Sequence, residues 1–376
     1  CRLVSDVPLG AFLSGGIDSS AIVAMMAKAN GRSVKTFTID FDEKTFSELN
    51  DAQCVADHCG TDHHVLKVTT DAMNLLPGLV WHFDEPFADS SAIPTYYVSK
   101  MAREHVTVIL SGDGGDELFA GYNNYAKKDQ YRHLLRFPKS IRHALFNRMA
   151  KVLPIHAPMR NFFKYMAWAT LDDGPGALGI YPYLKEDLLS HDMKNQLMQF
   201  DSMACIRETM QSCTDSDKLA RLQYVDTKHY LPGDILVKVD RMSMAHSLET
   251  RAPLLDYRLV EFAARLPIPL RMRSGTSKYL LKRVLRKYLP SGILAKRKHG
   301  FSIPIGPWLQ TSLNGFAREI LLDERARKRN LFNTEVVADM LQYHTQGRRD
   351  YSDWIWTLLI LELWFQTYMD QATRRA

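Results

Sequence analysis

The sequence of 376 residues predicts an α/β fold in which a parallel sheet is followed by a large helical portion. Two apolar runs, residues 9–13 and 106–110, lead into turns that are rich in glycine, serine and acidic residues. Between these runs, β-rich and helix-forming segments alternate, which indicates parallel strands with helices covering both faces of the sheet. Beyond residue 123 no clear strand pattern follows, and prolines interrupt mainly helical sequence.

The elements follow from the local pattern in chain order. The first apolar run predicts a strand, two glycines predict a tight turn, and the helix-forming residues 21–29 predict a helix. By the same reasoning, we expect further strands at residues 34–41, 63–68 and 106–110, and helices at residues 47–59, 71–82 and 93–104. Residues 7–125 would then form a nucleotide-binding core. Residues 126–376 would form a helical part that completes the active site, so that residues 1–376 are one domain.

Composition and charge restrict the class of protein. The net charge is +6 and the basic residues are spread along the chain, which suits small anionic substrates and does not by itself indicate nucleic acid. The five cysteines form no C-x-x-C pair, so we expect free thiols in a reducing, cytoplasmic compartment. No apolar run reaches the roughly 18 residues of a membrane span, and no signal peptide is visible.

The first glycine turn, residues 13–20, reads Leu-Ser-Gly-Gly-Ile-Asp-Ser-Ser. The free N–H groups at the start of the following helix, together with serine hydroxyls, form a typical phosphate site. The turn is neither a Walker A loop nor a G-x-G-x-x-G motif. It resembles the pyrophosphate loop of the ATP pyrophosphatase (PP-loop) group, which implies a Rossmann-like parallel sheet. Asp18 carries the same sign of charge as a phosphate, so we expect a bridging Mg²⁺ there.

The second glycine turn, residues 111–122, follows the apolar run at residues 106–110. Asp113, Asp116 and Glu117 place three carboxylates within five residues at the end of a buried strand. Burying that many acids is costly unless a metal or a cationic group of a substrate offsets the charge. Because ligands bind at the carboxyl ends of parallel strands, we expect both glycine turns to belong to one site.

Charged residues later in the chain are weaker signals. Asp234, Lys238 and Arg241 lie on one helical face, and spacing alone would favour a solvated stripe. Glu249 and Arg251 form a charged pair within apolar sequence, and buried charges are usually paired or functional. Lysine candidates are Lys278, at a predicted helix start, and Lys298, in a loop between prolines, although each taken alone is typical of a surface lysine.

Four motifs in this order resemble the synthetase domain of glutamine-dependent asparagine synthetases. They are the two glycine turns, the segment 240–256 that contains Asp-Arg-Met-Ser-Met-Ala and Leu-Glu-Thr-Arg-Ala-Pro-Leu-Leu-Asp, and Lys298-His299-Gly300-Phe301. β-Lactam synthetase is a related but weaker match. Residues 131–220 and 310–376 carry no motif of that family.

The resemblance implies a ligase that makes an amide in two steps. ATP adenylates a carboxylic acid, which in the type enzyme is aspartate, and ammonia then displaces AMP, so that the other product is pyrophosphate. In that family the ammonia comes from an N-terminal glutaminase domain, which has no counterpart in these residues. We therefore expect a segment upstream of Cys1 and free ammonia as the nitrogen source for this chain. The same resemblance implies Mg²⁺ and asparagine biosynthesis, and it allows for a homodimer.

The resemblance also assigns residues. Ser14, Gly16, Ser19 and Lys278 would hold pyrophosphate, and Asp18 and Asp116 would carry Mg²⁺. Lys298 would balance charge on the α-phosphate, and Asp113 stands where the family often has glutamate, near the adenylate and the ammonia. Further residues of the ATP site would be Phe12, Leu13, Gly15, Ile39, Ser111 and Gly112. The acceptor acid would be held among Asp234, Lys238, Arg241, Glu249 and Arg251.

Alternatives remain open at this level. The acceptor acid is not identified by the sequence, and a related acid could replace aspartate. A tRNA-modifying ATP pyrophosphatase would require a basic RNA-binding extension or paired reactive cysteines, and neither is visible. A non-catalytic scaffold would not require the acids Asp18 and Asp116 with the lysines Lys278 and Lys298. Cys1 is not expected to be a catalytic nucleophile, because a phosphate loop follows it so closely.

Overall fold

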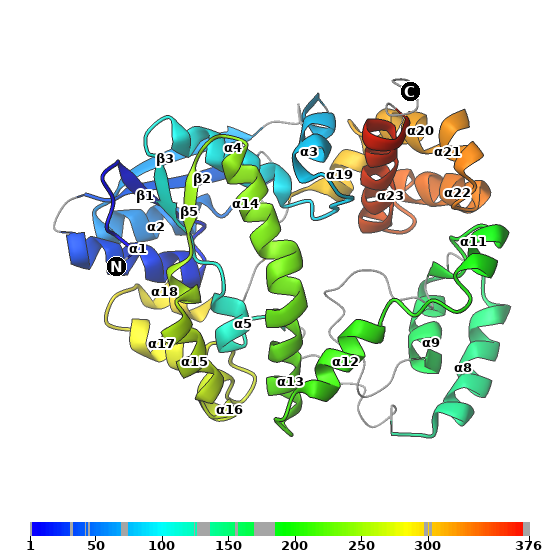
Figure 1. Ribbon diagram of the computed structural model, residues 1–376, viewed down its shortest axis with the longest axis horizontal. Coiled ribbons are helices and arrows are strands. Elements are labelled where there is room, and N and C mark those ends of the chain that lie inside the picture. Colours follow the sequence, from blue (N-terminus) through cyan, green and yellow to red (C-terminus); the bar gives the residue numbers. More distant parts are fainter. Residues whose placement is uncertain are drawn as a thin grey trace. The chain divides into compact units, whose positions relative to one another are not determined.

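The computed structural model describes residues 2–30, 33–41, 43, 46–68, 74–123, 125, 136–154, 157–168, 185–296, 300 and 303–370. The chain divides into two compact units, which are labelled by element in Figure 1. Unit 1 comprises Cys1–Asp84, Asp89–Tyr125 and Asp215–Pro304. Unit 2 comprises Glu85–Ala88, Ala126–Thr214 and Ile305–Ala376. The segment 215–304 is therefore grouped with the sheet.

Unit 1 is built on a five-stranded parallel sheet with the order β3-β2-β1-β4-β5. This confirms the predicted α/β class with its parallel sheet. The strands are β1 (Leu9–Phe12), β2 (Lys35–Phe41), β3 (Asp62–Val68), β4 (Val108–Leu110) and β5 (Glu249–Arg251). The strand order reverses between β1 and β4, so the turns after these two strands meet at the point where doubly wound sheets bind their ligands.

Strand β5 corrects the expectation that no strand follows residue 123. It pairs with β4 in parallel register, with Val108 opposite Glu249 and Leu110 opposite Arg251. Its three residues, Glu-Thr-Arg, contain no apolar alternation, so the local pattern carries no strand signal. The strand exists because β4 supplies its hydrogen-bonding partners. The charged pair is also less buried than expected, since Glu249 is exposed.

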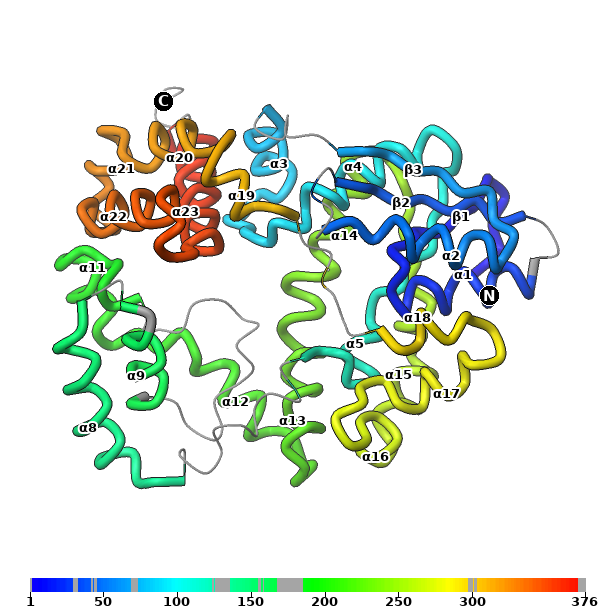
Figure 2. The backbone as a smooth tube through the Cα atoms, turned by 180° about the vertical axis from the view of Figure 1, so that it is seen from behind, coloured from blue at the N-terminus to red at the C-terminus, as the bar shows by residue number. Residues whose placement is uncertain are grey.

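Helices cover the sheet of unit 1 (Figures 1 and 2). Helices α1 and α2 pack against each other and against β1, β2 and β3, whereas α4 packs against β2 and β3 and also against α14. The bounds are α1 (Ile17–Asn30), α2 (Leu49–Cys59), α3 (Leu76–Phe83), α4 (Ala92–Arg103), α5 (Gly115–Phe119), α13 (Lys218–Val225), η2 (Asp226–Ile235), α14 (Leu236–Met244), η3 (Pro253–Leu255), α15 (Tyr257–Arg265), α16 (Ile268–Arg271), α17 (Tyr279–Leu285) and α18 (Ser291–Ala295).

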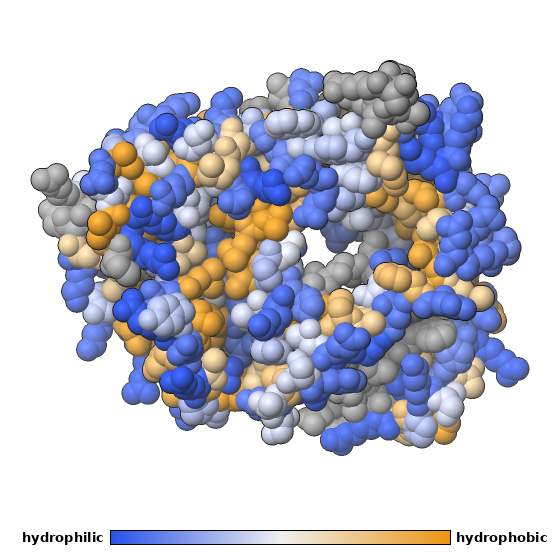
Figure 3. Space-filling view, viewed as in Figure 1, coloured by the Kyte–Doolittle hydropathy of each residue, from blue (hydrophilic) through white to orange (hydrophobic). Residues whose placement is uncertain are grey.

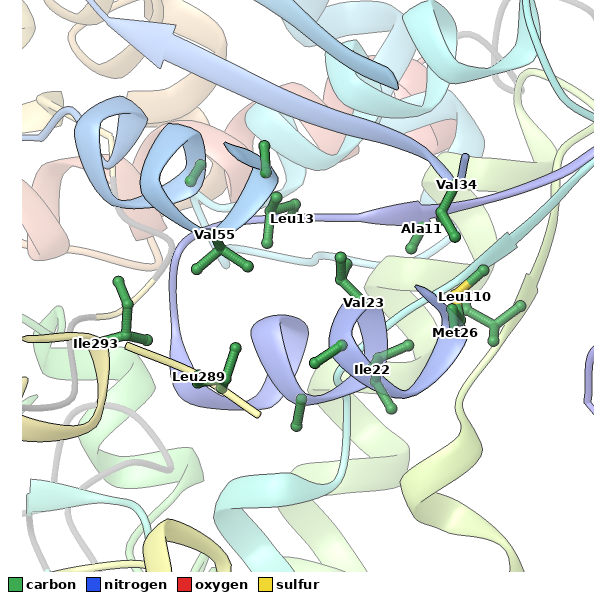
Figure 4. Packing of buried hydrophobic residues seen from close by; sticks show 14 of the residues in the cluster. Ala11, Leu13, Ile22, Val23, Met26, Val34, Val55, Leu110, Leu289 and Ile293 are labelled. Atoms are coloured by element: carbon green, nitrogen blue, oxygen red, sulfur yellow. The ribbon is translucent and has the colours of Figure 1, made fainter. Parts of the chain in front are cut away.

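The core of unit 1 joins the first β-α-β repeat to the later helices. Val23 of α1 and Val55 of α2 meet Leu13, which follows β1, and Leu289 and Ile293 close the same cluster from the segment around α18 (Figure 4). Leu13 and Val55 are almost fully buried. Burying side chains of this size stabilises the fold by about 1.5–3 kcal/mol each. The cluster therefore fixes the turn that begins directly after Leu13.

A long helical run crosses unit 1 from α13 through η2 to α14 (Figure 1). Its middle part, η2, is π-helical and contains Pro232. Proline cannot donate a backbone hydrogen bond within a helix, and π-helical stretches are frequent near functional sites. The run begins with an N-cap, because the Asp217 side chain accepts hydrogen bonds from Leu219 N and Ala220 N.

Unit 2 is helical in its described part. A hairpin of α8 and α9 forms one cluster, and α19, α20, α22 and α23 pack together as another. Residues 185–190 join residues 330–333 through an antiparallel bridge between Leu189 and Phe332. The bounds are α8 (Lys139–Val152), α9 (Pro158–Trp168), α11 (His191–Gln196), α12 (Ala204–Ser212), α19 (Ile305–Gln310), α20 (Asn314–Leu321), α21 (Glu324–Arg329), α22 (Thr334–Thr345), α23 (Ser352–Trp364) and η4 (Phe365–Met369). The predicted helical C-terminal portion is confirmed.

A buried ion-pair network ties the start of α9 to the residues before α11. Asp187 accepts hydrogen bonds from Arg160 Nη2 at 3.0 Å and from Lys164 Nζ at 2.7 Å. The side chains of Arg160 and Lys164 are almost entirely buried. Burial alone would raise the pKa of Asp187, but the two cations hold it at about 2. The network therefore stays ionised at neutral pH.

The surface in view in Figure 3 is mostly hydrophilic, with apolar residues showing between the polar ones. On α8, Ile141, Leu145 and Met149 are exposed at successive four-residue intervals. Across the residues that the structure describes, no helix has both the length and the apolar character that a bilayer crossing requires.

Candidate active site

The turn after β1 folds back on itself through serine hydroxyls. Ser14 N donates to Ser19 Oγ at 3.2 Å, and the two hydroxyls of Ser14 and Ser19 lie 3.0 Å apart. Gly15 has a φ of +72°, in the left-handed region that favours glycine. A Cβ at Gly15 would lie 2.6 Å from Asp51 Cβ on α2, so the turn can pass α2 only as glycine. The result is a compact loop with hydroxyls at the start of α1.

The turn after β4 packs directly against the first one. A Cβ at Gly112 would lie 2.6 Å from Ser19 N, and a Cβ at Gly115 would collide with the Asp18 side chain. These glycines therefore let the two loops touch. The contact brings together residues about 100 positions apart in the sequence, at the switch point of the sheet.

Asp18 and Asp116 converge on one lysine. Lys278 Nζ donates to Asp18 Oδ2 and lies 2.6 Å from Asp116 Oδ1. All three side chains are largely buried, with exposed fractions of 4% for Lys278, 13% for Asp18 and 10% for Asp116. Two carboxylates that bond the same nitrogen lie within about two hydrogen-bond lengths, or about 6 Å, of each other. They are thus close enough to share one cation.

The two turns open into a cavity of about 650 Å³. Most of the site residues predicted from the sequence line it. They are Phe12, Leu13, Ser14, Gly15, Gly16, Asp18, Ser19, Ile39, Ser111, Gly112, Asp113, Asp116, Lys238 and Lys278. A volume of this size is in the range of sites that hold small molecules and cofactors.

The remaining predicted residues lie elsewhere or outside the description. Lys298 falls in residues 297–299, which the structure does not describe. Arg241 is partly exposed and faces Asp84 at 3.4 Å. Arg251 Nε donates to Glu249 Oε1 at 2.6 Å, and its Nη1 donates to the carbonyls of Arg2 and Val4. None of these three described side chains lines the cavity.

Asp89 is a cavity residue that the sequence did not indicate. Lys238 Nζ donates to Asp89 Oδ2 at 2.6 Å, and Ser91 donates to Asp89 through both its N–H and its hydroxyl. Burial alone would raise the pKa of Asp89, but Lys238 and Ser91 hold it below its ordinary value. The sequence signal was an Asp-Ser-Ser helix start before α4, which marks a cap and reveals nothing of the distant lysine.

Asp234 adjoins this ion pair without lining the cavity. Burial, and then the charge of Asp89, raise the pKa of Asp234 to about 7. Ionising both acids beside one lysine is unfavourable, because the two carboxylates repel each other. Asp89 therefore carries the charge, and Asp234 binds the proton below about pH 7.

Glu117 and Tyr122 form a second polar part of the cavity wall. The Tyr122 hydroxyl donates to Glu117 Oε1, and burial together with the Glu117 charge raises the pKa of Tyr122 far above its ordinary range. Gln223 of α13 donates to the carbonyls of Glu117 and Leu118, and buried Arg271 donates to Gln223 at 2.8 Å. This chain of bonds anchors α5, which carries Asp116.

Comparison with known proteins matches nearly the whole chain to one family. The asparagine synthase family model matches residues 1–366. A Bacillus subtilis protein, glutamine-hydrolyzing asparagine synthetase 1, is 38% identical over 363 residues, which are 96% of this chain and 56% of that protein. A Mycobacterium bovis protein, whose name marks it as an unconfirmed glutamine-hydrolyzing asparagine synthetase, is 34% identical over 98% of this chain and 56% of its own length.

A more distant relative carries another name. A Penicillium rubens protein, amidase chyE, is 24% identical over 86% of this chain and 53% of its own length. The chain thus spans about half the length of the curated relatives it matches. The extent of the family match and the identity to the first of these relatives lead to one conclusion: the chain belongs to the asparagine synthase family.

Proposed function

We propose that this chain catalyses ATP-dependent amide synthesis, in which a carboxylic acid is first adenylated and ammonia then replaces AMP. The observation that carries the proposal is the meeting of two glycine turns and two carboxylates in one cavity at the switch point of the sheet. Such a site suits a nucleotide whose phosphates lie at the start of α1. Membership in the asparagine synthase family supports amide formation as the reaction class.

The proposed ATP site divides into a phosphate part and a nucleoside part. Ser14, Gly15, Gly16 and Ser19 offer backbone N–H groups and hydroxyls at the positive end of the α1 dipole, where pyrophosphate would be stabilised. The adenosine would lie along the lining residues Phe12, Leu13, Ile39, Ser111 and Gly112. Lys278 would donate to the pyrophosphate oxygens.

We propose Mg²⁺ at Asp18 and Asp116. The fit rests on two buried carboxylate oxygens that already share one cation, the Lys278 ammonium. Oxygen ligands are those that Mg²⁺ prefers, and Mg²⁺ commonly uses one or two carboxylates together with phosphates and water. When bound, the ion would neutralise charge on the phosphates.

The acceptor acid is proposed to lie beside Lys238, which lines the cavity together with Asp89 and has Asp234 nearby. Asp113 of that turn lines the cavity and would face the adenylate and the incoming ammonia. Lys298 would stabilise the charge that develops on the α-phosphate. The names of the relatives favour aspartate as the acid, and they favour glutamine, hydrolysed elsewhere in a longer protein, as the source of the ammonia.

We propose that the reaction takes place in the cytoplasm. The cysteines within the described residues, Cys54, Cys59, Cys205 and Cys213, are free thiols, as is usual in a reducing compartment.

An ATP–pyrophosphate exchange assay over a panel of carboxylic acids tests the proposal. We expect exchange that depends on one acid of the panel, with aspartate as the first candidate. Addition of ammonium should convert ATP into AMP and pyrophosphate together with the amide. Formation of ADP and phosphate in an acid-dependent reaction would contradict the proposed cleavage site. Asp116→Asn should abolish exchange, and Glu261→Gln on the surface of α15 should leave it unchanged, because Glu261 is exposed and pairs only loosely with Arg265.

A further inference from the structure

The Lys278 ammonium lies between the carboxylates of Asp18 and Asp116 and contacts both. It donates to Asp18 Oδ2 and lies 2.6 Å from Asp116 Oδ1. Only 3% of Lys278 is exposed. The three charges sum to −1 in a largely buried place, so the lysine already neutralises part of the pair. Lys278 thus supplies a cation at the point where a metal bound by Asp18 and Asp116 would lie.

This placement of Lys278 is built into the backbone. Lys278 has a φ of +54°, in the left-handed region that a lysine seldom adopts. Its N–H donates to the carbonyl of Phe119 at 3.0 Å, which ties the start of α17 to the end of α5. A Cβ at Gly121 would collide with both Lys278 Cε and the Asp116 carboxylate, so the contact forms only because residue 121 is glycine. Several separate features therefore direct this one side chain to the carboxylates.

One point between two carboxylates cannot hold an ammonium and a divalent ion together, because like charges in contact repel strongly away from bulk water. We infer that Lys278 closes the metal position in the nucleotide-free chain, and that a divalent ion enters only with a pyrophosphate group that takes over the Lys278 ammonium. This inference rests on the proposed function, since it concerns the same phosphate site.

Replacement of the Lys278 ammonium by a divalent ion at Asp18 and Asp116 leaves every charged group with a partner of opposite sign. A pyrophosphate group alone would approach two carboxylates of its own sign, and a divalent ion alone would meet the ammonium. When both arrive, the ion pairs with Asp18 and Asp116 and the ammonium pairs with phosphate oxygens. Lysine suits this role because its compact charge moves on a flexible four-carbon stem while the backbone stays fixed. Ser14 and Gly16 line the same cavity as Lys278, and the lysine already contacts Asp18 of the same turn, two residues after Gly16.

Binding of Mn²⁺, used as a spectroscopic substitute for Mg²⁺, tests the inference without any turnover. The wild-type chain is dialysed against Mn²⁺ alone, with inorganic pyrophosphate, or with AMP, and bound Mn²⁺ is measured by electron paramagnetic resonance. We expect retention of Mn²⁺ by the protein with pyrophosphate, and at least about tenfold weaker binding with AMP or with no ligand. The AMP arm separates phosphate-driven entry from a general effect of nucleotide binding.

Variants identify the residue. Lys278→Met keeps the length of the side chain and removes its charge, so this variant should bind Mn²⁺ alone at least about tenfold more tightly than the wild-type chain. Mn²⁺ should also raise its melting temperature, because a ligand that binds only the folded state stabilises it. Lys282→Met is the matched control: Lys282 lies four residues later on α17 and lines the same cavity. It should tighten binding of Mn²⁺ alone much less than Lys278→Met does. Adding Asp116→Asn to Lys278→Met should remove the gain.

The outcomes separate the inference from the proposed function. Tight binding of Mn²⁺ by the wild-type chain without pyrophosphate would overturn the inference and leave the proposed function standing. Equal Mn²⁺ binding by Lys278→Met and the wild-type chain would overturn it as well. Failure of both chains to retain Mn²⁺ even with pyrophosphate would instead contradict the proposed metal role of Asp18 and Asp116. If Lys278→Met does not fold, the three wild-type arms decide the matter by themselves.

Discussion

At the scale of single residues, three of the lysines that line the cavity are paired with acids. Lys278 pairs with Asp116, Lys238 pairs with Asp89, and Lys296 pairs with Asp51. A lysine that is paired with a carboxylate stabilises the fold, and it can bind a substrate only after it leaves that carboxylate. Lys298 lies two positions after Lys296 in the sequence and outside the described residues, so its role as the cation of the α-phosphate stays a prediction from the sequence.

Lys298→Ala should lower kcat of the proposed reaction by roughly 10²–10³, or about 3–4 kcal/mol, because a placed cation stabilises charge that develops only in the transition state. Lys298→Arg should restore activity only in part, since the guanidinium is wider and its donors are arranged differently. Lys296→Ala is the control and should change kcat little. Steady-state kinetics of the three variants decide the assignment: wild-type kcat in Lys298→Ala would show that another residue does this work.

Asp234 should make stability depend on pH. Its pKa is raised to about 7 in the folded chain, and an unfolded aspartate titrates near pH 4. The folded state therefore binds more protons than the unfolded state between these values, and Asp234 contributes stability at low pH that is lost as the pH rises through about 7. In Asp234→Asn, this loss should disappear.

Urea unfolding at pH 5, 6, 7 and 8 measures the effect of Asp234. The variant should gain stability relative to the wild-type chain as the pH rises and level off above about pH 7. Asp89→Asn should behave differently: the pKa of Asp89 is lowered, so its contribution is present at neutral pH, and its removal breaks the ion pair with Lys238. A constant difference between Asp234→Asn and the wild-type chain across this range would contradict the raised pKa.

At the scale of elements, the turns are what the sequence predicted best. Glycines, serines and acids that follow an apolar run form a local signal, and both turns lie at strand ends as that signal indicated. Asp89 could not be found in this way, since its partner Lys238 is 149 residues away in the chain. Strand β5 was not predicted for a related reason: it is a strand because it pairs with β4, and its own residues carry no strand pattern. The sequence therefore predicted features that depend on neighbouring residues, but not contacts between residues far apart in the chain.

Gly15→Ala should test how tightly the first turn is built. Alanine disfavours a φ of +72°, and its Cβ would lie 2.6 Å from Asp51 Cβ. The two effects together should cost roughly 2–4 kcal/mol of unfolding free energy. Gly292→Ala, in α18 with open space around its Cβ position, should be neutral or slightly stabilising. Urea unfolding curves compare the two variants, and equal stability of both would mean that the turn can yield.

At the scale of the whole molecule, each unit has its own means of holding together. Unit 1 uses the apolar cluster around α1 and Leu13, and unit 2 adds buried charge through Arg160, Lys164 and Asp187. The candidate site residues that the structure describes all belong to unit 1. The sequence predicted the sheet and the helical remainder, and the family resemblance placed Lys278 at the phosphate site. Local patterns did not predict that residues 215–304 as a whole group with the sheet, because that grouping depends on contacts between distant segments.

Asp187→Asn should destabilise unit 2 by about 2–3 kcal/mol at neutral pH, less than for a fully buried pair because water reaches Asp187 in part. In the wild-type chain the same contribution should fade as the pH falls from about 4 towards the folded pKa of about 2. Melting temperatures at pH 7 and pH 3 should therefore differ more between the two chains at pH 7. Glu324→Gln, in the exposed pair with Lys328, is the control and should have almost no effect.

The charged, three-residue form of β5 also bears on how the molecule behaves at high concentration. β5 is the last strand in the order of the sheet, and an outer strand offers backbone groups to which another chain could add. A strand this short, carrying Glu249 and Arg251, is a poor template for such addition, as is β3 at the opposite end with its Asp, His and Lys residues. Glu249 and Arg251, which the sequence suggested as part of an acceptor site, thus disfavour fibrous self-association through this edge of the sheet.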